Sequence, residues 1–147
     1  MIQSILVVCT GNICRSPIGE RLLQQKLPTF TIASAGICGL AGRPADAHAQ
    51  KIAAMYGVSL ADHVARPLTA AMMREYDLIL AMESAQINRI SLIAPEMRGK
   101  VMLFGHWDNE REIPDPYRKS HEAFEAVYTL LDQSAQQWAQ ALKVQQG

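Results

Sequence analysis

The sequence predicts an α/β protein with a parallel sheet, and two observations support this. Four short runs rich in apolar and β-branched residues have the length of buried strands: residues 4–8, 30–34, 77–82 and 101–104. Segments with helix signals lie between these runs and after the last one, and such alternation gives parallel strands with right-handed crossovers. The 147 residues, 49% of them apolar, are enough for one core. We therefore expect a single domain over residues 1–147.

The helices are predicted from capping signals and apolar periodicity. The first covers residues 17–27, with Ser16 as its N-cap and Pro17 as its first residue. Thr69 and Ser84 are the expected N-caps of two others. These later helices cover residues 45–56, 69–74, 84–93 and 120–142. The last helix carries one apolar stripe that is expected to face the core: Phe124, Val127, Leu131, Trp138 and Leu142.

Charge and cysteine content narrow the classes of partner and compartment. Lys and Arg together number 14, as do Asp and Glu, so the net charge is zero and neither nucleic acid nor an anionic membrane is an expected partner. The apolar run before Cys9 is too short for a signal core or a membrane span. Three cysteines do not form a disulfide framework, which suggests a reducing cytoplasm. We expect a monomer that uses no cofactor and no metal.

The most informative stretch is the turn C-T-G-N-I-C-R-S-P at residues 9–17, between the first strand and the first helix. The N–H groups of such a turn point inward, and the helix dipole favours negative charge there. Gly11 lets the backbone approach a ligand, and Asn12 tolerates a left-handed conformation. The Arg15 guanidinium matches two oxygens of a tetrahedral oxyanion. The turn is therefore predicted to bind phosphate or a mimic such as arsenate.

Cys9 makes this turn a candidate reaction centre as well as a binding site. A helix N-terminus and a nearby cation lower a thiol pKa from ~8.5 to about 3.5–7.5, so we expect Cys9 to attack bound phosphorus as a thiolate. Ser16, if it does not cap the helix, can donate its hydroxyl to the sulfur. Cys14 has two open interpretations: it packs under the loop, or it protects Cys9 from over-oxidation through a reversible disulfide. Cys38 is expected to be structural or idle.

A phosphate ester needs a general acid to protonate its leaving oxygen. The candidates in the late polar loop are Asp108, Glu110, Glu112 and Asp115, and chemistry alone does not choose among them. Asp115 has the best local argument because prolines on both sides stiffen its backbone.

The turn sequence resembles the phosphate-binding loop of the low-molecular-weight protein tyrosine phosphatases. The resemblance implies a four-stranded parallel sheet in the order 2-1-3-4, with helices on both faces and the loop after strand one. It implies that Cys9 forms a cysteinyl-phosphate and that Arg15 holds the phosphoryl oxygens. The other loop residues in this family's pattern are Thr10, Gly11, Asn12, Ile13, Cys14 and Ser16.

The same resemblance assigns roles outside the loop. The family's general acid lies in an Asp-Pro-Tyr motif, matched here by Asp115, Pro116 and Tyr117. In the family, a Ser and a His hold the loop Asn in its strained conformation, and Ser34 and His63 occupy the matching places.

Close relatives of the family suggest alternatives. Arsenate reductases of this fold need further cysteines downstream, and no Cys follows Cys38. Protein-arginine phosphatases carry Thr where this chain has Ile13, and the apolar Ile13 favours an aromatic ring over a guanidinium group. A non-catalytic phosphotyrosine-binding module would lack the nucleophile, the Arg or the acid, and all three are present.

The cleft walls resemble one bacterial subgroup, and this resemblance covers nearly the whole chain. Eukaryotic members have an aromatic residue at the place of Leu40 and a second aromatic after Tyr117, where this chain has Arg118. These departures, and the run at residues 105–120, resemble the bacterial members that act beside tyrosine autokinases of capsule and exopolysaccharide export. The resemblance implies that the substrate is the tyrosine-rich tail of such a kinase, and Leu40 and Tyr117 are the expected substrate contacts.

Overall fold

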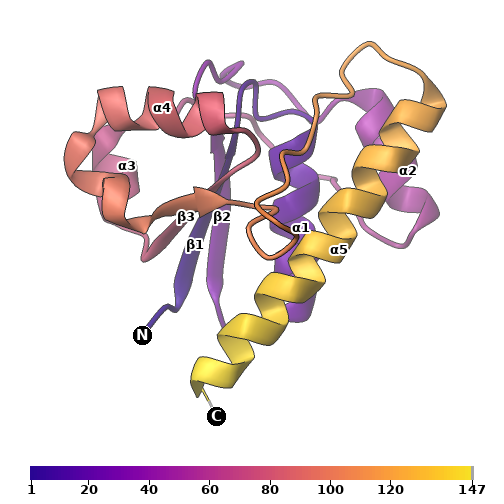
Figure 1. Ribbon diagram of the computed structural model, residues 1–147. Helices are drawn as coiled ribbons and strands as arrows, with labels where there is room; N and C mark the ends of the chain where they lie inside the picture. Colours follow the sequence, from indigo (N-terminus) through magenta and orange to yellow (C-terminus); the bar gives the residue numbers. More distant parts are fainter. Residues whose placement is uncertain (147) are drawn as a thin grey trace.

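The computed structural model describes residues 1–146 and has one four-stranded sheet (Figure 1). The strands are β1 (Ser4–Cys9), β2 (Thr31–Gly36), β3 (Leu78–Ala81) and β4 (Val101–Leu103). All three neighbouring pairs are parallel and the order is β2-β1-β3-β4. The predicted fold class and strand order are thus confirmed. The chain crosses from one side of β1 to the other between β2 and β3, which places the crevice for a ligand at the carboxyl end of β1.

Helices cover both faces of the sheet. They are α1 (Arg15–Lys26), α2 (Ala47–Met55), α3 (Ala70–Arg74), α4 (Ser84–Ile93) and α5 (His121–Gln146), with a 3₁₀ turn, η1 (Pro95–Lys100), that the sequence did not predict. In Figure 1, α1, α2 and α5 lie on one side of the sheet and α3 and α4 on the other. Within residues 1–146, no helix combines the length and apolar character needed to cross a membrane.

Strand β1 is buried on both faces and divides the core into two parts. Ile5 and Val7 pack into the larger cluster with α1, α2 and α5. Leu6 and Val8 point the other way, into the cluster with α3 and α4. All four side chains are 0% exposed. A strand with period-two alternation and two apolar faces is the expected centre of such a sheet.

Helices α1 and α2 each start two residues from the predicted position. Helix α1 begins at Arg15, two residues before Pro17, and Ser16 does not cap it, because the Ser16 hydroxyl is occupied by contacts inside the loop. Helix α2 begins at Ala47, because the Asp46 carboxylate caps it by accepting from the Ala49 N–H.

Helix α4 has its predicted bounds, Ser84–Ile93, but its N-cap is Glu83 and not Ser84. Glu83 keeps extended backbone angles, and the Gln86 side chain accepts its N–H. Thr69 was predicted correctly as the N-cap of α3, since its hydroxyl accepts from the Met72 N–H.

Candidate active site

The loop between β1 and α1 forms the floor of a pocket of about 260 Å³. The Cys9 sulfur lies 2.9 Å from Ser16 Oγ and accepts the Asn12 N–H at 3.3 Å. Because Asn12 Nδ2 donates to Ser16 Oγ, the Ser16 hydroxyl hydrogen is free to point at the sulfur. The sulfur therefore has two hydrogen-bond donors within reach. The pocket is lined by Cys9, Thr10, Gly11, Ile13, Cys14, Arg15, Cys38, Leu40, Asp115 and Tyr117.

Asn12 has a left-handed backbone, with φ of 59°, and its side chain is completely buried. Its Nδ2 group donates to Ser16 Oγ at 2.8 Å and to Ser34 Oγ at 3.0 Å. The Asn12 carbonyl lies 2.6 Å from His63 Nε2, which therefore acts as the donor. The structure thus brings Ser34 and His63 to Asn12, as the resemblance implied.

Arg66 completes this arrangement and was not predicted from the sequence. Its backbone N–H donates to Asn12 Oδ1 at 3.0 Å, and its Nε donates to the Ser34 carbonyl at 3.0 Å. The signal available in the sequence was proximity, because Arg66 follows His63 by three residues. Its main contribution is a backbone group, which residue type alone does not reveal.

Arg15 is 2% exposed, so its charge is almost fully removed from water. Its Nη1 donates to Glu83 Oε1 at 2.5 Å and to the Ile113 carbonyl at 2.7 Å. Its Nη2 lies 4.0 Å from Asp115 Oδ2. The two contacts from Nη1 hold the guanidinium in place beside the loop.

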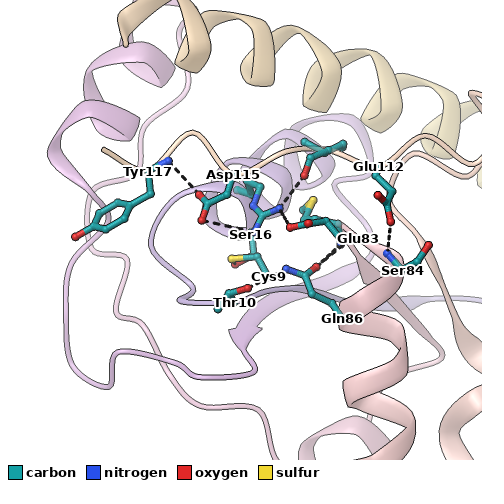
Figure 2. A network of polar contacts seen from close by, with 12 residues as sticks. Cys9, Thr10, Ser16, Glu83, Ser84, Gln86, Glu112, Asp115 and Tyr117 are labelled. Atoms are coloured by element: carbon teal, nitrogen blue, oxygen red, sulfur yellow. Dashed lines mark hydrogen bonds and ion pairs between the residues drawn. The ribbon is translucent and has the colours of Figure 1, made fainter. Parts of the chain in front are cut away.

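Figure 2 shows that the first turn of α4 also reaches the loop. Gln86 Nε2 donates to Thr10 Oγ1 at 3.1 Å, while Gln86 Oε1 accepts the N–H groups of Met82 and Glu83. The Ser84 N–H donates to Glu112 Oε1 at 2.8 Å. Neither Glu83 nor Gln86 was a predicted site residue, because Ser84 was the expected cap.

Of the four acids considered, Asp115 is the one that lines the pocket. Its Oδ1 accepts the Tyr117 N–H at 3.0 Å, which directs the other oxygen toward Arg15. Asp108 pairs with Arg111, and Glu112 bonds to α4. The side chain of Asp115 is half exposed, so it can exchange protons with water.

The three cysteines have different environments, and all are free thiols. Cys14 is buried next to Cys9 in the loop, and burial, reinforced by the charge of Asp46, raises the pKa of its thiol. Cys14 is therefore a neutral thiol at pH 7. Cys38 is exposed at the pocket, 3.9 Å from Arg89 Nη2, a place that the sequence did not predict. Within residues 1–146, no three side chains of His, Cys, Asp or Glu lie close enough together to hold a metal ion.

Comparison with known proteins adds three findings. The model of the family described as low molecular weight phosphotyrosine protein phosphatase matches residues 4–147. The low molecular weight protein-tyrosine-phosphatase Wzb of Salmonella typhimurium is 61% identical over 147 residues, which are 100% of this chain and 99% of the relative. Among solved structures, Vibrio vulnificus Wzb in complex with benzylphosphonate has a TM-score of 0.94 and 51% identity, over 96% of this chain and 99% of that one.

A more distant solved structure has the same fold. The YwlE arginine phosphatase from Geobacillus stearothermophilus has a TM-score of 0.92 and 30% identity, over 97% of this chain and 94% of that one. The fold is thus shared by phosphatases named for different phosphorylated residues. The fold alone therefore does not identify the substrate, and the side chains that line the pocket must be considered.

Proposed function

Because this chain belongs to the low molecular weight phosphotyrosine protein phosphatase family, we propose that it is a protein-tyrosine phosphatase in which Cys9 carries the phosphoryl group during the reaction. One observation carries the proposal. The Cys9 sulfur lies in the pocket that Arg15 and Asp115 also line, and it accepts from Ser16 and Asn12. Nucleophile, cation and acid therefore surround one volume.

In the first step the Cys9 thiolate attacks phosphorus, a sulfur–phosphorus bond forms, and the bond from phosphorus to the tyrosyl oxygen breaks. Asp115 gives its proton to that oxygen, so tyrosine leaves as a neutral phenol. The loop N–H groups and Arg15 hold the three equatorial oxygens while the attacking and leaving atoms are in line. Nη1 of Arg15 is occupied by Glu83 and Ile113, so the opposite edge of the guanidinium, Nε and Nη2, faces the oxygens.

In the second step water attacks the phosphorus of the cysteinyl-phosphate. The Asp115 carboxylate takes a proton from the water, the sulfur–phosphorus bond breaks, and inorganic phosphate is released. The Ser16 hydroxyl and the Asn12 N–H stabilise the departing thiolate. Asp115 is then protonated and Cys9 is a thiolate, so the enzyme has returned to its starting protonation state.

The pocket walls favour an aromatic substrate. Ile13, Leu40 and Tyr117 all line the pocket and offer apolar surface beside Cys9. A phosphotyrosyl ring can pack on these groups, whereas a phosphoarginine guanidinium would be desolvated against the same apolar surface. The Vibrio relative binds benzylphosphonate, which likewise joins a tetrahedral oxyanion to an aromatic ring.

The proposed physiological substrate is the tyrosine-rich tail of a bacterial tyrosine autokinase, dephosphorylated in the cytoplasm by a monomer of this protein. The support is the similarity to relatives named Wzb and the resemblance of the cleft walls to the bacterial subgroup. A trapping experiment tests this idea. Cys9→Ser should bind the phosphorylated kinase tail and should not bind the same tail without its phosphoryl groups.

The activity is tested by phosphate release from a phosphotyrosyl peptide in EDTA. We expect metal-independent turnover by the wild type and by Cys38→Ser, and none by Cys9→Ser. The two variants make the same exchange of sulfur for oxygen, so the comparison isolates the thiol at the loop. Turnover of a phosphoarginyl peptide but not of the phosphotyrosyl one would favour the arginine phosphatase instead.

A further inference from the structure

Within the proposed phosphatase reaction, we infer that Glu83 is the positioning residue for Arg15. This inference rests on the proposed function and adds a residue to it. The Glu83 carboxylate, labelled in Figure 2, accepts Arg15 Nη1 at 2.5 Å. The Ile113 carbonyl accepts the same nitrogen at 2.7 Å.

The two contacts fix which edge of the guanidinium is free. Nη1 carries two hydrogens, and the two oxygens of Glu83 and Ile113 account for both. The group is planar, so holding one nitrogen from two directions sets the orientation of the other two. Nε and Nη2 then form the fork that meets phosphoryl oxygens, and Nη2 lies on the side of Asp115.

Glu83 is itself well placed for this task. It lies two residues after β3 and is the N-cap of α4, where the helix dipole stabilises a carboxylate. Its N–H donates to Gln86 Oε1 at 3.1 Å, and the other end of that amide holds Thr10 of the loop. The turn at residues 83–86 thus contacts the loop twice, through Arg15 and through Thr10.

Charge also argues for this role. Arg15 is 2% exposed, and a buried cation without a counter-ion is costly. Asp115 cannot serve as the constant counter-ion, because the mechanism requires it to be protonated before each turnover. Glu83 does not take part in proton transfer, so it balances the charge of Arg15 throughout the cycle.

The test compares Glu83→Ala, Glu83→Gln and Glu112→Ala. Glu112 is the matched control, because it bonds the Ser84 N–H in the same helix turn but does not contact Arg15. We expect Glu83→Ala to lower kcat for a phosphotyrosyl peptide by about 10- to 100-fold, with a smaller change in KM, since a misaligned fork costs most in the transition state. Glu83→Gln keeps an acceptor at the same reach and should lose less. Glu112→Ala should keep the wild-type kcat.

A second readout does not depend on turnover. Calorimetric titration with inorganic phosphate should show about tenfold weaker binding to Glu83→Ala than to Glu112→Ala, while thermal melting reports the stability of both variants. A kcat within twofold of the wild type in Glu83→Ala, or an equal loss in Glu112→Ala, would overturn the inference. Tighter phosphate binding with a higher kcat/KM in Glu83→Gln would also overturn it, because Glu83 would then compete for Arg15. If the wild type does not hydrolyse the peptide, the proposed function fails, and the phosphate titration still decides the role of Glu83.

Discussion

Replacing Asn12 by glycine or by alanine tests how strongly one side chain holds the phosphate-binding loop. Asn12 is 0% exposed, has φ of 59°, and makes three side-chain hydrogen bonds, to Ser16 Oγ, Ser34 Oγ and the Arg66 N–H. Both variants remove all three bonds. Glycine accepts the left-handed backbone, whereas alanine does not, so the pair separates the side-chain contacts from the backbone conformation.

The magnitudes follow from the contacts. Three hydrogen bonds at about 1 kcal/mol each predict that Asn12→Gly loses about 3 kcal/mol of unfolding free energy. For Asn12→Ala, the left-handed backbone costs a further ~1–2 kcal/mol, of which about 0.4–1 is recovered because alanine is less flexible than glycine when unfolded. Asn12→Ala should therefore be less stable than Asn12→Gly by about 1 kcal/mol. Both should remain folded if the wild type has a common stability of about 5–15 kcal/mol.

Urea unfolding measures these differences. With a slope of about 2 kcal/mol per molar, a loss of 3 kcal/mol moves the midpoint by about 1.5 M. The matched control is Asn109→Gly, because Asn109 also has a left-handed backbone, with φ of 53°, but is exposed. It should change stability by no more than about 0.5 kcal/mol. An Asn12→Gly variant within 1 kcal/mol of the wild type would refute the argument that the buried side chain holds the loop.

Three further predictions concern ionisable groups. Asp115→Asn should lower kcat by ~10²–10⁴ on a phosphotyrosyl peptide but much less on 4-nitrophenyl phosphate, whose leaving group needs less protonation; equal losses would contradict its role as acid. Burial raises the pKa of the Cys14 thiol, so brief iodoacetamide treatment at pH 7 should label Cys9 at least about ten times faster than Cys14. Fragment mass spectrometry measures the two labelling rates, and equal rates would contradict this prediction. Burial, with a contribution from Asp132, raises the pKa of Tyr128 to about 12, above the ~10 of an unfolded chain. The stability that the buried neutral phenol contributes is complete below pH ~10 and is lost as pH rises toward 12. Urea titrations should therefore show that Tyr128→Phe loses less unfolding free energy between these pH values than the wild type does. The same dependence of unfolding free energy on pH in both proteins would contradict this.

The sheet was predictable because its evidence is local. A buried parallel strand needs a continuous apolar run, and residues 4–8 and 77–82 have one. The order of the strands came from the resemblance, since periodicity does not say which strands are neighbours. The loop was predictable for a related reason: Cys9 and Arg15 are close in sequence and lie between a strand and a helix.

The helix starts were harder to predict because capping depends on distant partners. Ser16 has the residue type of an N-cap, but its hydroxyl contacts Cys9 and Asn12 inside the folded loop. Glu83, and not Ser84, is the N-cap of α4, and its carboxylate pairs with Arg15, a residue 68 positions away. Residue type describes what a side chain can donate or accept, and only the tertiary structure decides which partner it meets.

The same principle explains how the site is assembled. The partners that hold Asn12 come from β2 and the segment after α2, whereas the partners that hold Arg15 come from the start of α4 and the late loop. These two groups of contacts hold different residues of the loop and share no partner. All of these partners belong to the protein itself, so the shape of the loop does not depend on a bound ligand. A positive field that exists before the substrate arrives needs no reorganisation during the reaction. The loop provides this field because residues distant in the sequence hold Asn12 and Arg15 in place.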